Sequence, residues 1–198
     1  MKLWEKVGHP LGGIGAERYT FESFGRTKIN AALYDYMPKF DISKNNAYIY
    51  GPVGSGKTHA ATGIAGIMGG TVMKLYQISR FVRWGMMQGG LDEGDMIGLF
   101  AGGRISTNSY FAEACPMLVI DDLGSEKLTE FSEQILFEII DLRISRGLNG
   151  LIITSNLPLE DMAKRLGSER VTSRIAMLCK DGIFSLEGEK DYRVASGA

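Results

Sequence analysis

The stretch GPVGSGKT at positions 51–58 crowds three glycines, a lysine and a threonine between an apolar run and a helical pattern. Glycine lets backbone N–H groups turn inward without a Cβ in the way, and the start of a helix adds unpaired N–H groups that favour an anion. The spacing fits the phosphate-binding pattern GxxxxGK[ST] at every fixed position. The alternative is an ordinary glycine-rich turn in a chain that has 26 glycines.

The phosphate-loop interpretation assigns chemistry to individual residues. Lys57 is expected to contact the β- and γ-phosphates of ATP and to act in catalysis, and the Thr58 hydroxyl is expected to ligate Mg²⁺. The residues expected to surround the nucleotide are Gly51, Pro52, Val53, Gly54, Ser55, Gly56, Lys57, Thr58 and His59.

Two acidic residues, Asp121 and Asp122, follow the apolar part of PMLVIDDLG (116–124). Mg²⁺ bound to phosphates takes further oxygen ligands, typically from a carboxylate near the phosphate loop and from water. Asp121 is therefore expected to hold Mg²⁺ through water, and Asp122 to orient and polarise the attacking water. The alternative is a surface turn, in which two adjacent carboxylates repel each other unless a cation offsets them.

A third polar group ends the apolar run of LIITSN (151–156). Ligands of α/β sheets bind beyond the carboxyl ends of the strands, so the Asn156 amide is expected to contact the γ-phosphate or the attacking water. The alternative is simple capping of a strand end by Thr154, Ser155 and Asn156.

These residues need a scaffold that brings strand ends together. Short apolar runs occur at 47–50, 71–76, 116–121, 150–155 and 182–188. Continuous runs of this kind suit strands buried on both faces of a parallel sheet. Helical patterns separate them, most clearly at 129–146, where the apolar stripe consists of Phe131, Ile135, Ile139 and Leu142, widened by Leu136 and Ile140. The alternation predicts a doubly wound α/β domain, with an earlier helix from residue 27 that Pro38 ends.

Composition narrows the class of protein. A chain of 198 residues is long enough for one domain with a core, or for one domain and a small appendage. The net charge of −1 does not require a nucleic-acid partner, so any DNA contact must come from a local patch. No apolar stretch reaches the roughly 20 residues of a membrane span, and no signal peptide is recognised. Cys115 and Cys179 are expected to be reduced, packed thiols of a cytoplasmic protein.

Taken together, these segments resemble the AAA+ ATPases, and within them the DnaC/IstB group of bacterial and phage ATP-binding proteins. The segments that carry the resemblance are YTFESF (19–24), YGPVGSGKTHAA (50–61), LVIDDLGSEK (118–127), LIITSNLPLEDM (151–162), GSERVTSRI (167–175) and GEKDYR (188–193). The resemblance implies an α/β P-loop NTPase fold of the AAA+ type. It has a five-stranded parallel sheet flanked by helices, the phosphate-loop strand near its centre, and no C-terminal lid domain. This domain is expected to span 19–198, after a short N-terminal arm over 1–18.

The same resemblance implies a homo-oligomer that binds ATP and Mg²⁺ at its subunit boundaries. Asn156 matches the sensor position, and Arg174 matches the arginine finger that completes a neighbour's site, with Arg170 as the alternative. Helicase-loader members hold a replicative DNA helicase and single-stranded DNA, and the Asp-Asp pair and SERVTSRI favour that branch. Loaders usually carry a sizeable N-terminal domain that binds the helicase. Here the helicase contact is expected either from the short arm, through Leu3, Trp4 and Val7, or from a separate protein.

A candidate DNA contact lies in KLYQISRFVRWGMMQGG (74–90), which places Lys74, Arg80 and Arg83 beside Tyr76, Phe81 and Trp84. Cations attract phosphates and aromatic faces stack on bases. The alternative is an amphipathic helix whose aromatic residues are core, and this is the favoured interpretation for Phe81 and Trp84. The acidic stretch 89–95 is expected to be a solvated loop.

The functional hypothesis is an ATP-dependent helicase loader of the DnaC-like type, and a phage origin is expected for it. One rival is an IstB-like transposition ATPase that acts on duplex DNA with a transposase. A second is a small-molecule phosphotransferase, for which no acceptor or lid motif is seen. A third is an assembly factor that binds ATP but barely hydrolyses it, because Asp122 is shorter than the usual glutamate.

Overall fold

The computed structural model describes residues 19–87, 92–102, 105–106, 111–112 and 115–192. The expected N-terminal arm over 1–18, with Leu3, Trp4 and Val7, lies outside the described residues, and so does Arg193 of GEKDYR.

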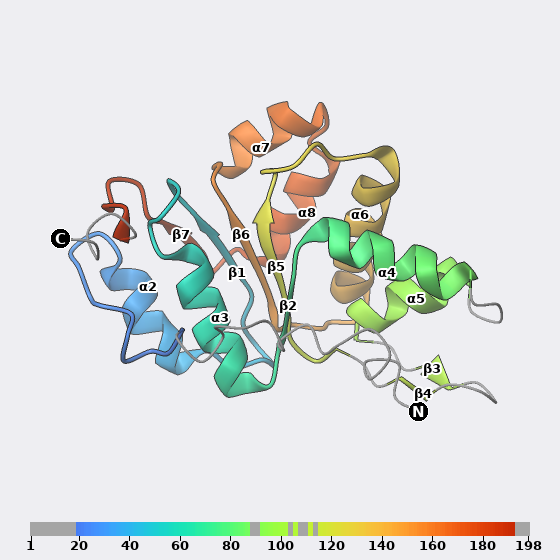
Figure 1. The fold of residues 1–198 in the computed structure, drawn as a ribbon, viewed down its shortest axis with the longest axis horizontal. Coiled ribbons are helices and arrows are strands. Elements are labelled where there is room, and N and C mark those ends of the chain that lie inside the picture. The colour runs from blue at the N-terminus through green and yellow to red at the C-terminus, as the bar shows by residue number, and fades with distance from the viewer. Residues whose placement is uncertain (1–18, 88–91, 103–104, 107–110, 113–114, 193–198) are drawn as a thin grey trace.

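Five parallel strands form the central sheet, in the spatial order β2-β5-β6-β1-β7 (Figure 1). They are β1 (Ala47–Tyr50), β2 (Thr71–Met73), β5 (Leu118–Leu123), β6 (Leu151–Ser155) and β7 (Ile183–Ser185). The predicted α/β fold with a five-stranded parallel sheet is confirmed. The phosphate-loop strand β1 lies directly beside the middle strand β6.

Helices cover both faces of this sheet. One face carries α2 (Ala31–Tyr36), the 3₁₀ helix η3 (Met37–Lys39) and α3 (Lys57–Met68). The other carries α4 (Leu75–Met87), α5 (Glu93–Phe100), α6 (Glu130–Ser145), α7 (Leu159–Leu166) and α8 (Arg170–Leu178). A small antiparallel pair, β3 (Ile105–Ser106) and β4 (Phe111–Ala112), lies apart from the main sheet. Within the described residues, no helix has the length and apolar character needed to cross a bilayer.

The strands alternate between two apolar cores, because successive side chains of a strand point to opposite faces. Tyr48 of β1 and Ile120 of β5 belong to the core under α4, α5, α6 and α8, whereas Ile49 and Val119 belong to the core under α2 and α3. All four side chains are inaccessible to solvent. Burial on both faces explains why these strands read as continuous apolar runs in the sequence.

Helix α6 confirms the predicted stripe of 129–146 to within one residue at each end. Thr129 is its N-cap and forms a reciprocal capping box with Ser132. Ile135 and Ile139 of the stripe are fully buried against the sheet.

Other boundaries differ from the expectation: the helix expected from residue 27 begins at Ala31, and its α-helical part ends at Tyr36, with Pro38 inside η3. The apolar run 71–76 is a strand only to Met73, because α4 begins at Leu75 and takes the remaining apolar residues into a helix. The stretch 89–95 was expected to be a solvated loop, and this was wrong for its end. The Asp92 side chain caps α5 by accepting the Asp95 N–H at 2.7 Å, and α5 then buries Met96 and Ile97.

Both cysteines are free and buried, as expected for packed thiols. The Cys115 thiol donates to the Met117 carbonyl, and burial raises the pKa of Cys179 to about 12. A thiol with so high a pKa stays protonated and unreactive at neutral pH.

The stripe pattern gave no signal for a buried cation on α6. Arg143 is only 1% exposed, and its guanidinium donates to the carbonyls of Phe100, Cys115 and Asn149 at 2.7–3.1 Å. Burial lowers the pKa of Arg143. Phe100 is the last residue of α5, Cys115 precedes β5, and Asn149 precedes β6. The Arg143 side chain therefore joins three separate chain segments near the amino-terminal ends of β5 and β6.

Replacement Arg143→Met keeps an unbranched chain but leaves three buried carbonyls without a donor. Because an unsatisfied buried polar group costs about 1–3 kcal/mol, we expect the free energy of unfolding to fall by about 3 kcal/mol. Urea denaturation measures the change. The matched control is Arg146→Met at the exposed end of the same helix, expected to stay within about 0.5 kcal/mol of wild type. Equal loss in both variants would contradict this account.

Candidate nucleotide-binding site

The phosphate loop joins β1 to α3 and needs glycine at two positions in particular. Gly54 has φ +81° and Gly56 has φ +92°, both in the left-handed region that side chains rarely adopt. A Cβ on Gly56 would lie 2.9 Å from the Phe24 ring. The 12-residue helix α3 begins directly after Gly56, so its first N–H groups face the concave side of the loop.

Lys57 and Ser55 hold the polar interior of this loop. The Lys57 ammonium donates to the carbonyls of Gly51 at 2.9 Å and Pro52 at 2.7 Å, and the residue is 6% exposed. The Ser55 hydroxyl is buried and has no hydrogen-bond partner among the described residues. An orphaned buried hydroxyl and a buried ammonium at the N-terminus of α3 fit a polyphosphate.

The side chains predicted to hold Mg²⁺ are brought together. The Thr58 hydroxyl donates to Asp121 Oδ1 at 2.8 Å, across the gap between α3 and β5. The hydroxyl oxygen keeps its lone pairs for a cation, because its proton is directed at the carboxylate. No cluster of three or more His, Cys, Asp or Glu that could hold a metal is found in the part of the chain that the structure describes. The oxygen donors of Thr58 and Asp121 fit Mg²⁺, which takes its remaining ligands from phosphates and water.

Asp122 lies beside Asn156. The Asn156 amide donates to Asp122 Oδ1 at 3.4 Å, and both residues are partly accessible. The second carboxylate oxygen of Asp122 accepts from Lys74 Nζ at 3.3 Å. The carboxylate predicted to orient water is therefore held by two donors.

Lys74 was grouped with Arg80 and Arg83 as a DNA contact, and in the structure its ammonium pairs with Asp122. β2 ends at Met73 beside β5, so Lys74 leaves the sheet at the edge where Asp122 lies. Lys74 pairs with that carboxylate, with 43% of its side chain exposed. The sequence could not show this, because the two residues are 48 positions apart and meet only through strand pairing.

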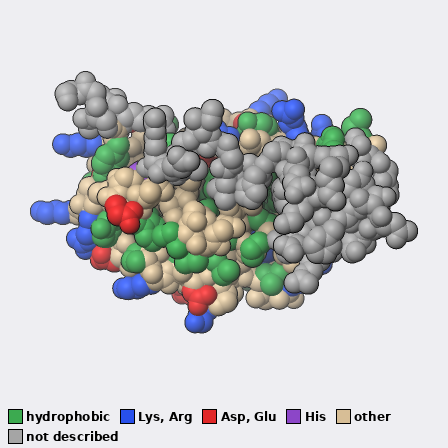
Figure 2. All heavy atoms as spheres, turned by 60° about the horizontal axis from the view of Figure 1, so that its bottom comes forward, with side chains coloured by type: hydrophobic (Ala, Val, Ile, Leu, Met, Phe, Trp, Pro, Cys, Tyr) green, Lys and Arg blue, Asp and Glu red, His purple; other side chains and the backbone are tan. Residues whose placement is uncertain are grey.

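Arg80 and Arg83 line a different pocket, of about 160 Å³, between α4 and the start of α6. Tyr76, Lys127 and Thr129 also line it. Phe81 is 5% exposed and Trp84 packs against the same core, which confirms the interpretation of these two rings as core. On the face shown in Figure 2, Lys and Arg side chains are spread along the rim without forming one continuous patch.

The histidine expected near the nucleotide turns toward the N-terminal segment. The His59 ring nitrogen Nε2 lies 2.9 Å from Ser23 Oγ and 3.0 Å from the Thr20 carbonyl, and the ring contacts those of Tyr19 and Phe24. The YTFESF segment is thus anchored to the first turn of α3. Phe24 of this segment lies against Gly56 of the phosphate loop.

The segment after β7 also contacts the phosphate loop. The Leu186 N–H donates to the Tyr50 carbonyl at 2.7 Å, and the Tyr192 N–H donates to the Gly54 carbonyl at 3.1 Å. A Cβ on Gly54 would lie 1.9 Å from the Asp191 carboxylate, so the chain passes directly against the loop. The sequence marked GEKDYR as a motif, but only the fold shows that it reaches the nucleotide loop.

The two candidate finger arginines both dock on α6 of their own chain. Arg174 pairs with Asp141 at 3.0 Å, and the Arg170 guanidinium stacks 3.6 Å from the centre of the Phe137 ring. These pairs are one helical turn apart on each helix, so α8 and α6 meet in two matched contacts. Since α8 covers the face of the sheet opposite to α3, neither arginine is paired with the phosphate loop of its own chain (Figure 1). Their action on a neighbouring subunit stays a prediction.

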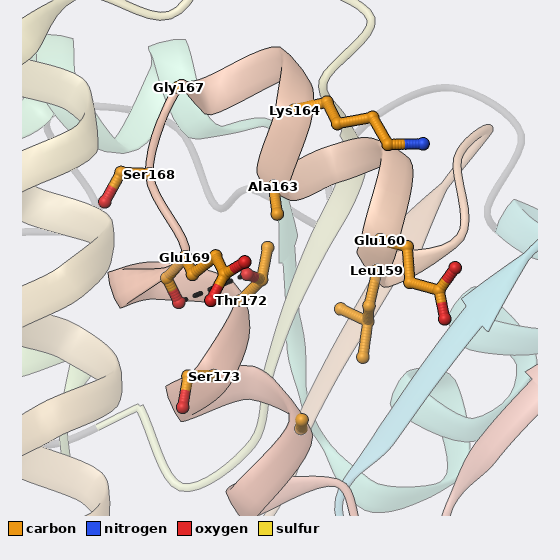
Figure 3. A pocket seen from close by; sticks show the side chains of 10 residues that line it. Leu159, Glu160, Ala163, Lys164, Gly167, Ser168, Glu169, Thr172 and Ser173 are labelled. Carbon is orange, nitrogen blue, oxygen red and sulfur yellow. Dashed lines mark hydrogen bonds between the residues drawn. The ribbon is translucent and has the colours of Figure 1, made fainter.

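A groove of about 570 Å³ between α7 and α8 contains none of the predicted site residues (Figure 3). Leu159, Ala163 and Thr172 line it, while Glu160 and Lys164 extend away at its edge.

The comparisons with known proteins agree with this geometry. The family model of the IstB-like ATP-binding proteins matches residues 37–183, which include the phosphate loop, the acid pair and Asn156. No curated protein is significantly similar in sequence.

Solved structures with the same fold include the DnaC helicase loader, with a TM-score of 0.65 and 21% identity over 87% of this chain and 99% of that one. DnaI gives a TM-score of 0.61 at 15% identity, over 87% of this chain and 92% of that chain. The replication initiator DnaA, bound to AMPPCP and single-stranded DNA, gives 0.63 at 18% identity, over 85% of this chain and 49% of that chain. At such identities these likenesses establish the fold.

The family model covers well over half of the chain, and its ATP-binding motifs occupy one edge of the sheet. The chain therefore belongs to the IstB-like ATP-binding protein family, with the P-loop AAA+ fold of the DnaC/IstB group.

Proposed function

We propose that this chain is an ATP-dependent loader that places a replicative DNA helicase on single-stranded DNA. The observation that carries the proposal is the assembly of Lys57, Thr58, Asp121, Asp122 and Asn156 at one edge of the sheet, in a chain that spans 99% of the DnaC helicase loader structure. ATP binding is a property of the family, whereas the helicase and the single-stranded DNA are part of the proposal.

Each residue at that edge has a separate task in hydrolysis. Lys57 leaves the carbonyls of Gly51 and Pro52 and donates to the phosphates, while Thr58 and Asp121 would hold Mg²⁺. When bound, Mg²⁺ neutralises charge on the transferring phosphoryl group. Asp122 orients the attacking water, and Asn156 holds the Asp122 carboxylate through its amide.

The proposal includes a second copy of the chain at the ATP site. Phosphoryl transfer is accelerated by a guanidinium that offsets charge in the transition state, and within this chain Arg174 and Arg170 bind Asp141 and Phe137 of α6. We propose that Arg174 of a neighbouring subunit supplies it in a homo-oligomer. The Asp141 pair is partly exposed, so exchanging it for a phosphate costs little.

A second candidate is a transposition ATPase of the IstB type, which acts on duplex DNA with a transposase. The family description favours it, because the matching model is named for IstB. A turnover assay separates the two when single-stranded and duplex DNA of the same sequence are compared. Stimulation by the single strand, and ATP-dependent transfer of the organism's replicative helicase to a circular single strand, support loading. Stimulation by duplex alone would favour the transposition ATPase.

Replacement Lys57→Ala removes charge-assisted hydrogen bonds to phosphate, each worth about 1.5–3 kcal/mol, so we expect ATP affinity to fall about 10- to 100-fold. Titration calorimetry measures it, with thermal unfolding of the ligand-free chain as a check on folding. Because Lys57 also binds two loop carbonyls, a small loss of ligand-free stability is expected too. Unchanged ATP affinity would exclude the phosphate-loop role.

Arg80 and Arg83 are expected to bind the phosphates of single-stranded DNA. Each phosphate contact with single-stranded DNA contributes about −0.7 to the slope of log affinity against log salt concentration. Two such contacts predict a slope near −1.4. The double variant Arg80→Ala/Arg83→Ala should lose most of that slope in fluorescence anisotropy. Lys74→Ala is the comparison, because Lys74 pairs with Asp122 and should alter hydrolysis without changing the slope. The same slope in the double variant would place the DNA contact elsewhere.

Arg174→Ala should retain ATP binding and lose about 10³- to 10⁵-fold in turnover. The test for action in trans is a mixture of Arg174→Ala subunits with Lys57→Ala subunits. Each variant is inactive alone, but some mixed boundaries combine an intact loop with an intact arginine, so part of the turnover returns. If mixed oligomers form and no turnover returns, Arg174 serves only its own Asp141.

A further inference from the structure

The pairing of β5 with β6 is interrupted at the point where the acid pair lies. The strands are in register up to Ile120 and Ile153, and pairing resumes at Leu123 and Ser155. Two residues of β5 therefore stand opposite one residue of β6. This two-against-one arrangement is a β-bulge, which leaves a backbone group without its ladder partner and re-aims nearby side chains.

The residue opposite the bulge is Thr154, and its hydroxyl bonds to both acidic residues. It donates to Asp121 Oδ1 at 2.7 Å and accepts the Asp122 N–H at 2.8 Å. Thr154 is fully buried. Asp122 has φ +58°, the one positive φ of a non-glycine residue in the described part of the chain. Such a backbone conformation persists only when its surroundings hold it.

We propose that Thr154 is a positioning residue for the ATP site. Its single hydroxyl fixes the position of both the Asp121 carboxylate and the Asp122 backbone. This proposal rests on the proposed roles of Asp121 with Mg²⁺ and of Asp122 with water. Thr58 also donates to Asp121 Oδ1, but it belongs to the first turn after the nucleotide loop. Thr154 belongs to the middle strand of the sheet, and so it fixes Asp121 to the rigid core.

The dual contact requires a group that donates and accepts at once. A threonine or serine hydroxyl does both, whereas valine has the shape of threonine and does neither. Loss of the hydroxyl removes a donor from the carboxylate and leaves the Asp122 N–H without its acceptor. Partners that orient a metal-binding side chain typically change metal affinity or activity about 10- to 100-fold when they are removed.

The first experiment uses the nucleotide-free chain and compares wild type with Thr154→Val and Thr154→Ser. Amide hydrogen exchange, measured by NMR, reports the Asp122 N–H. We expect faster exchange of this amide in Thr154→Val and near wild-type exchange in Thr154→Ser. The matched control is Thr71→Val, a buried threonine at the opposite, amino-terminal end of β2. It should leave the Asp122 amide unchanged.

The second experiment measures ATP binding by calorimetry over a range of Mg²⁺ concentrations. Thr154→Val should bind ATP without Mg²⁺ as wild type does, and should need about 10- to 100-fold more Mg²⁺ to reach its tight-binding state. Turnover at saturating ATP should fall while KM for ATP measured at high Mg²⁺ changes little. Thr154→Ser should recover both properties.

The outcomes separate this proposal from the proposed function. Wild-type Mg²⁺ dependence and wild-type Asp122 exchange in Thr154→Val would overturn the positioning role and leave ATP hydrolysis intact. Failure of the wild-type chain itself to bind ATP with Mg²⁺ would overturn the proposed function. If Thr154→Val does not fold, Thr154→Cys replaces it, because a thiol is a weaker donor and acceptor than a hydroxyl. Thr154→Cys should change the Asp122 exchange rate and the Mg²⁺ requirement in the same direction as Thr154→Val, but by less.

Discussion

One chain of hydrogen bonds, from Thr58 through Asp121 to Thr154, ties the nucleotide loop to the middle of the sheet. It joins α3, β5 and β6, three elements that are remote in sequence. The bonds form because parallel neighbouring strands bring their carboxyl ends to the same edge, where the loop after β1 also lies. If that edge were disordered, neither the metal ligands nor Asp122 would have a defined position.

The same edge concentrates charge of both signs at short range. Lys57 points into the loop, Asp121 faces Thr58, and Lys74 and Asn156 hold the Asp122 carboxylate. Adjacent carboxylates repel each other, and the nearby cation and the donors offset that cost. A bound ATP would replace the contacts that Lys57 now makes with the carbonyls of Gly51 and Pro52.

Segments from both ends of the described chain converge on the loop. Phe24 packs against Gly56, and Tyr192 bonds to the Gly54 carbonyl. Glu189 accepts from Thr27, so these two flanking segments also bind each other. On the opposite face, α8 and α6 are joined through Arg170 with Phe137 and Arg174 with Asp141. The phosphate loop thus leads into α3, whereas the two arginines belong to α8 on the opposite face of the sheet.

Sequence by itself determined the parts that local chemistry specifies. GPVGSGKT predicted a loop with left-handed glycines, because the backbone there needs conformations that other residues avoid. Continuous apolar runs predicted strands buried on both faces, and the stripe of 129–146 predicted α6. Only the tertiary structure decided which charges meet: the pairing of β2 with β5 brings Lys74 to Asp122, and the bulge between β5 and β6 makes Thr154 the common partner of the acid pair. Register and strand order depend on contacts between residues tens of positions apart, and no local pattern encodes those distances.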